Sequence, residues 1–119
     1  MNLLSQLVLR TNNLEPLRDF YEKLLAVSFT PEQHDNGPRH YSYQLGDILV
    51  ELYPTTQKEH TIKKSVKDRL GFAIDNLDDL FDRIDWKYAK TSVFETETGR
   101  AMELSDPDGR TVYVEEKRK

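Results

Sequence analysis

Glu51 is a carboxylate in the middle of an apolar segment, and Tyr113 is a phenol in the same kind of position. Each has an aliphatic residue on both sides, so strand alternation places it on the face opposite its neighbours. A charge on a covered strand needs a partner. Gln6, Arg10 and Arg69 lie in two other alternating segments. These five side chains are predicted to bind a small polar molecule, or to support acid–base chemistry with Glu51 as base and Tyr113 as acid.

The segments that hold these residues occur twice in the chain. Residues 6–14 resemble residues 69–77, and residues 46–52 resemble residues 109–114. Self-similarity at a fixed interval is typical of one supersecondary unit used twice. Neither copy can bury its own apolar face alone.

Hydrophobic periodicity predicts the same order of elements in both halves. Each half reads as a strand, an amphipathic helix and three further strands. The predicted ranges are strand 3–10, helix 14–25 and strands 28–32, 39–45 and 47–53, then strand 69–74, helix 77–84 and strands 92–97, 100–105 and 110–115. Asn12 and Asn13 are candidate N-caps of the first helix and Asn76 of the second. The fold class is α+β.

A chain of 119 residues is one domain by size. We expect a single domain over 1–119, with module one at about 1–54, a polar, lysine-rich connector at about 55–67 and module two at about 68–116. A net charge of −4 and no dense basic face argue against nucleic acid as a partner. No apolar stretch is long enough to span a membrane, and no signal peptide is recognisable, so a cytoplasmic location is expected.

The residue types exclude several kinds of site. With no cysteine there is no thiolate metal site and no catalytic thiol. The histidines His34, His40 and His60 have no metal-like spacing. His34 and His60 fall in predicted loops and are expected to be solvated. His40 falls on a predicted strand, with no evident carboxylate partner in the sequence.

The ordered set of segments 6–10, 20–25, 50–52, 70–74 and 106–109 resembles the vicinal oxygen chelate superfamily. That superfamily includes glyoxalase I, fosfomycin-resistance transferases, extradiol dioxygenases and bleomycin-resistance proteins. The resemblance covers nearly the whole chain. It implies two βαβββ modules whose curved mixed sheets enclose a cavity, commonly completed in a homodimer.

The resemblance also implies four positions for metal ligands, one on the first and one on the last strand of each module. In this chain Gln6, Glu51, Arg69 and Tyr113 hold these positions. Arg69 replaces an expected histidine, and Tyr113 replaces an expected glutamate. A guanidinium stays protonated and repels a divalent cation, and a neutral phenol is a poor substitute for a carboxylate. The positions are therefore degenerate, and no cofactor is expected, with a divalent metal as the alternative.

Two function classes follow. The first is a homodimer that binds a small molecule in a metal-free cavity through Gln6, Arg10, Glu51, Arg69 and Tyr113. The second is an enzyme, either a glyoxalase-like lyase or isomerase, or another vicinal oxygen chelate enzyme, with an altered metal site, or a metal-free catalyst. An Arg69 close to Glu51 would lower the pKa that a base needs, which favours binding over catalysis. A third class is an interaction module with a filled cavity. Whether Arg69 pairs with Glu51 or with an anionic ligand stays open.

Overall fold

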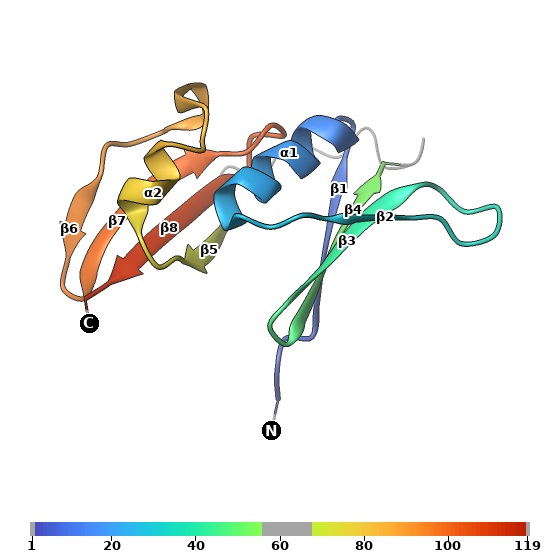
Figure 1. Ribbon diagram of the computed structural model, residues 1–119, viewed down its shortest axis with the longest axis horizontal. Helices are drawn as coiled ribbons and strands as arrows, with labels where there is room; N and C mark the ends of the chain where they lie inside the picture. Colours follow the sequence, from blue (N-terminus) through green and yellow to red (C-terminus); the bar gives the residue numbers. More distant parts are fainter. Residues whose placement is uncertain (1, 56–67, 119) are drawn as a thin grey trace.

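The computed structural model describes residues 2–55 and 68–118, and both halves show the predicted order of elements (Figure 1). The first half contains β1 (Gln6–Thr11), α1 (Leu14–Leu25), β2 (Thr30–Glu32), β3 (His40–Leu45) and β4 (Ile48–Pro54). The second half contains β5 (Arg69–Ala73), α2 (Leu77–Phe81), a 3₁₀ helix η1 (Trp86–Tyr88), β6 (Phe94–Thr96), β7 (Gly99–Ser105) and β8 (Thr111–Lys117). The α+β class with two βαβββ modules is confirmed. The predicted connector, apart from residue 55, lies outside the described residues.

Each module builds its own four-stranded mixed sheet. Sheet one has the order β1-β4-β3-β2 and sheet two the order β5-β8-β7-β6. The first strand of each module pairs in parallel with the last, and the remaining pairs are antiparallel. The two sheets therefore have the same topology, as the sequence repeat predicts.

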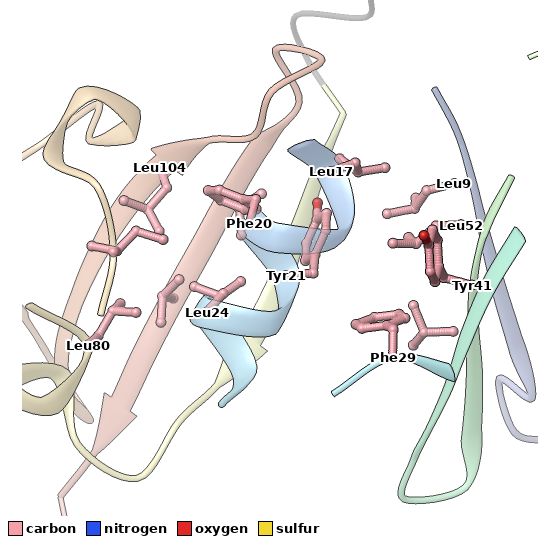
Figure 2. Packing of buried hydrophobic residues seen from close by; sticks show 14 of the residues in the cluster. Leu9, Leu17, Phe20, Tyr21, Leu24, Phe29, Tyr41, Leu52, Leu80 and Leu104 are labelled. Carbon is pink, nitrogen blue, oxygen red and sulfur yellow. The ribbon is translucent and has the colours of Figure 1, made fainter. Parts of the chain in front are cut away.

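Helix α1 lies between the two sheets and contributes to one core shared by both modules (Figure 2). Phe20 and Leu24 point toward sheet two and α2, and the Phe20 ring meets the Tyr88 ring edge-on at 5.1 Å. Leu17 lies nearer sheet one, and Tyr21 lies between the sheets, with its ring centre 6.1 Å from that of Phe72 on β5. Both sheets thus turn their apolar faces toward α1, and the helix fills the space between them. Within one chain the sheets do not close around a cavity, which differs from the enclosed arrangement that the resemblance implies.

A buried polar network ties α1 to the turn between β7 and β8. The Tyr21 hydroxyl donates to Asp106 Oδ2 at 2.8 Å, and Arg110 Nη1 donates to the same oxygen at 3.0 Å. Burial, and then the negative charge of Asp106, raise the pKa of Tyr21 well above its usual value. The Thr11 hydroxyl on β1 donates to Asp108 in the same turn at 2.9 Å. Hydrogen bonds as well as apolar packing therefore fix the two modules relative to each other.

The two helices differ in their ends. Asn76 caps α2, accepting from the backbone N–H of Asp78 at 2.8 Å, whereas the side chain of Asn13 makes no cap hydrogen bond to α1. Helix α2 ends at Phe81, three residues before the predicted end, because the chain turns and then becomes extended at Asp85 (φ −79°, ψ 123°). Ile84 is nevertheless buried in the core.

No helix in the described part of the chain is long and apolar enough to cross a lipid bilayer.

Candidate functional site

The side chains that do not face α1 form an open face on each sheet. Strand alternation and the observed register define both faces. On sheet one the open face carries Gln6, Val8, Arg10, His40, Ser42, Glu51 and Tyr53. On sheet two it carries Arg69, Gly71, Ala73, Phe94, Ala101, Glu103, Thr111, Tyr113 and Glu115. All five predicted site residues lie on one of these two faces.

Gln6 and Glu51 form the centre of the sheet-one open face. The parallel pairing of β1 with β4 places Val8 directly beside Glu51, and Gln6 two pairs further along, beside Leu49. The Gln6 amide Nε2 donates to Glu51 Oε1 at 2.5 Å. This bond gives the mid-strand carboxylate the partner that its position requires. The other oxygen, Oε2, lies 3.8 Å from His40 Nε2.

Arg10 lies on the same face beside an aromatic ring. Its guanidinium carbon is 5.0 Å from the centre of the Tyr53 ring, within the range of a cation–π contact. Burial, and then the negative charge of Glu51, raise the pKa of Tyr53. Arg10 thus supplies a positive charge next to the acidic centre of this face.

Arg69 and Tyr113 come together on the sheet-two open face. Arg69 lies over the Tyr113 ring at 5.3 Å, and its Nη1 is 3.5 Å from Glu103 Oε2. The ring centre of Phe94 is 6.4 Å from that of Tyr113. Glu103, which the sequence analysis did not select, sits directly opposite Tyr113 in the β7–β8 register. Arg69 therefore pairs with Glu103 in this structure and not with Glu51.

The four positions implied for metal ligands are divided between the two faces. Gln6 and Glu51 lie on sheet one, Arg69 and Tyr113 on sheet two, and α1 with its core separates the sheets. The donor chemistry does not fit a divalent metal at these positions, because only the first pair offers free oxygen ligands and Arg69 carries a fixed positive charge. No step of a metal-dependent reaction can be built on them.

A further cluster lies at the end of the sheet-one open face, where the sequence indicated no site. His40 is the first residue of β3 and lies opposite Glu32, the last residue of β2. His34 lies in the loop that connects β2 to β3. His40 is 1% exposed, and its ring stacks on that of Tyr53 at 4.2 Å. Its Nε2 is 3.8 Å from Glu51 Oε2, so His40 does have a neighbouring carboxylate. The register of β2 against β3 and of β3 against β4 creates this proximity, and single-sequence spacing does not reveal it. The only signal was the two-residue spacing of Glu32 and His34, which puts both on one side of an extended chain.

Comparison with known proteins places the fold. No protein-family model matches the sequence, and a search of curated proteins found no match. Among solved structures, a glyoxalase-related enzyme from Fulvimarina pelagi superposes with a TM-score of 0.70 at 14% identity, over 96% of this chain and 87% of that one. A glyoxylase/bleomycin resistance protein/dioxygenase domain from Frankia sp. EAN1pec gives a TM-score of 0.64 at 16% identity, over 99% of both chains. A lactoylglutathione lyase from Agrobacterium tumefaciens gives 0.63 at 14% identity, over 98% of this chain and 94% of that one.

Each of these structures superposes on nearly the whole of this chain. The protein therefore has the glyoxalase/bleomycin-resistance fold, the fold of the vicinal oxygen chelate superfamily. At such low identity the likeness defines the fold and leaves the chemistry to the residues described above.

Proposed function

We propose that two copies of the chain form a homodimer that binds a small polar molecule between the sheet-one open face of one copy and the sheet-two open face of the other. The observation that supports this most strongly is the division of the predicted site residues. By strand alternation, Gln6 and Glu51 lie on the face of sheet one turned away from α1, and Arg69 and Tyr113 on the corresponding face of sheet two. If the sheet-one face of one copy meets the sheet-two face of its partner, a two-fold axis repeats that contact and builds two equal sites.

The chemistry of the faces suits such an arrangement. Val8 and Phe94 are 37% and 40% exposed, so each face carries apolar surface that gains from being covered. The sheet-one face carries Glu32, Glu51 and Arg10, and the sheet-two face carries Arg69, Glu103 and Glu115. Carboxylates and cations on both faces could pair across the interface and fix its register. A ligand between the faces would meet a carboxylate, an amide, a guanidinium and a phenol.

The donor set favours binding over metal-dependent chemistry at these four positions. Arg69 occupies a ligand position with a group that repels a cation, and Tyr113 stacks beneath it. The cavity would therefore hold its ligand by hydrogen bonds and charge. A glyoxalase-like lyase or isomerase with a displaced metal site is the second candidate, and the His40 cluster beside Glu51 is the observation in its favour.

The oligomer is tested by the mass of the native chain in solution. Light scattering should give 28.0 kDa, twice the 14.0 kDa of one chain. A thermal-shift screen of small carboxylates, amines and amides in metal-free buffer should then reveal stabilising compounds. A mass of 14.0 kDa at every concentration, or a screen without stabilising compounds, would contradict the proposal.

Complementation tests whether the site uses both faces. Glu51→Gln and Arg69→Gln should each abolish stabilisation by the compounds found in the screen. In a mixed dimer of the two variants, one site combines the intact Glu51 with the intact Arg69. Random exchange makes about half of the dimers mixed, each with one intact site of two, so about a quarter of the binding should return. Arg118→Gln is a matched control and should bind like the native chain, and no recovery after proven exchange would refute a shared site.

A further inference from the structure

The open face of sheet one ends in a cluster with the composition of a metal site. Glu32, His34 and His40 each offer a ligand atom, and these atoms all lie within 4.8 Å of one another. The imidazoles of His34 and His40 lie side by side, with ring centres 5.2 Å apart. None of these three residues holds a position that the fold resemblance assigns to a metal.

The hydrogen bonding of the two His40 ring nitrogens is that of a side chain ready to bind a metal ion. Its Nδ1 lies 3.2 Å from the backbone carbonyl oxygen of Pro38. A carbonyl oxygen only accepts, so Nδ1 is the donor, and in the neutral ring Nε2 then presents its lone pair. A backbone carbonyl on the far nitrogen is the usual orienting contact of a metal-bound histidine. The Nε2 atom is buried and has no hydrogen-bond partner among the described residues. A buried nitrogen left in this way is unfavourable unless something binds to it.

The distances agree with one shared ion. Two ligands bound to a tetrahedral ion, at bond lengths of about 2.1 Å, lie about 3.4 Å apart. His34 Nε2 is 3.5 Å from Glu32 Oε2, and His40 Nε2 is 3.8 Å from Glu51 Oε2. The second distance is too long for a hydrogen bond. The ligand atoms of Glu32, His34 and His40 already lie within 4.8 Å of one another, and Glu51 adjoins this group through His40.

Neighbouring side chains hold both carboxylates so that one oxygen remains available. The Ser42 hydroxyl donates to Glu32 Oε1, and Gln6 Nε2 donates to Glu51 Oε1. In each case Oε2 is the atom that faces a histidine. Hydrogen bonds of this kind to the outer oxygen orient metal-bound carboxylates. Two carboxylates would also balance the charge of a divalent ion.

We propose that Glu32, His34 and His40, with Oε2 of Glu51 as the fourth ligand, bind a divalent transition-metal ion such as zinc. Two imidazoles and two carboxylates suit zinc and its first-row neighbours, whereas calcium and magnesium prefer oxygen ligands alone. The site goes beyond the proposed function, which needs no metal at the four inherited positions. It meets that site only at Glu51, so a metal would sit at the border of the ligand-binding face.

The test is metal titration of the full, tag-free chain after chelator treatment. Zn²⁺ is followed by calorimetry, and Co²⁺ by the visible absorption that appears when it enters a tetrahedral site. We expect one ion per chain, with Zn²⁺ displacing Co²⁺. His34→Ala and Glu32→Gln should each weaken the binding at least tenfold, and both residues are accessible enough for the variants to keep their melting temperature. Glu97→Gln, an exposed carboxylate on the other module, is the matched control and should leave the affinity unchanged.

The absence of Co²⁺ absorption at one equivalent would overturn the proposal. Native Zn²⁺ affinity in both His34→Ala and Glu32→Gln would also overturn it. Neither measurement needs a dimer or a small molecule. Failure of the proposed function therefore leaves this test unaffected, and failure of metal binding leaves the mass and complementation experiments unaffected.

Discussion

Removing the hydroxyl of Tyr21 tests how the two modules are held in place. The Tyr21→Phe variant keeps the ring, which packs edge-on against Phe20 at 5.0 Å, and deletes only the hydrogen bond to Asp106 Oδ2. A hydrogen bond to a charged acceptor contributes about 1.5–3 kcal/mol. Asp106 keeps Arg110 on Oδ2 and the backbone N–H groups of Asp108 and Arg110 on Oδ1. The carboxylate is therefore not left unpaired, and a loss of about 2 kcal/mol is expected.

This loss can be expressed as a melting temperature. Unfolding entropy is about 2.1 cal/mol/K per residue, which is about 0.25 kcal/mol/K for this chain, so Tyr21→Phe should lower the melting temperature by about 8 °C. Thermal unfolding followed by circular dichroism measures the shift. Tyr88→Phe is the control, because its hydroxyl has no hydrogen-bond partner among residues 2–55 and 68–118. Equal small shifts in both variants would refute the role assigned to the network.

The same variant predicts a pH effect with a definite sign. The folded state raises the pKa of Tyr21, and the unfolded chain has a tyrosine pKa near 10. The stabilising contribution of Tyr21 is thus complete below pH 10 and is lost as the pH rises further, because the unfolded chain releases its proton first. The difference in unfolding free energy between native chain and Tyr21→Phe should narrow above pH 10. A constant difference up to pH 11 would contradict the raised pKa.

Two further predictions concern helix ends. Ala26 follows α1 in the left-handed conformation (φ 56°, ψ 49°), which glycine adopts at lower energetic cost. Ala26→Gly should therefore raise the free energy of unfolding, measured in urea, by a few tenths to about 1 kcal/mol. A lower free energy of unfolding would contradict this. Asn76→Ala removes the cap of α2 and should cost about 1 kcal/mol, whereas Asn13→Ala, which removes no side-chain cap bond, should cost clearly less in the same assay. Equal costs for the two asparagines would show that cap geometry does not account for the difference.

The alternation of apolar and polar residues along the strands predicted which side chains share a face of a sheet. Gln6 and Glu51 were assigned to one face because each alternates with residues that face the helix, and the structure joins them by a hydrogen bond. The internal repeat likewise predicted two modules of the same topology. Both inferences depend on the two-residue period of a strand, which a single sequence displays directly.

The sequence did not predict how the two sheets and α1 are arranged in space. Whether α1 fills the space between the sheets depends on packing between residues far apart in the chain, so the split between Glu51 and Arg69 could not be foreseen. The partners of Arg69 and His40 depend on strand register, which brings Glu103 opposite Tyr113 and Glu32 opposite His40. A shift of one residue would turn these side chains to the other face, and the register of a hairpin depends on the exact geometry of its turn, which the sequence pattern does not define to the residue.

Cross-linking of the two open faces tests the proposed shared site most directly. The native chain has no cysteine, so the double variant Val8→Cys, Gly71→Cys carries only the two introduced thiols. Val8 lies beside Glu51, and Gly71 lies beside Tyr113 with room for a side chain. A short bismaleimide should convert the double variant to a covalent dimer of 28.0 kDa, twice the single-chain 14.0 kDa, whereas Asp19→Cys, Gly71→Cys should react far more slowly. A product that stays at 14.0 kDa, with both thiols joined within one chain or left unlinked, would contradict the face-to-face dimer.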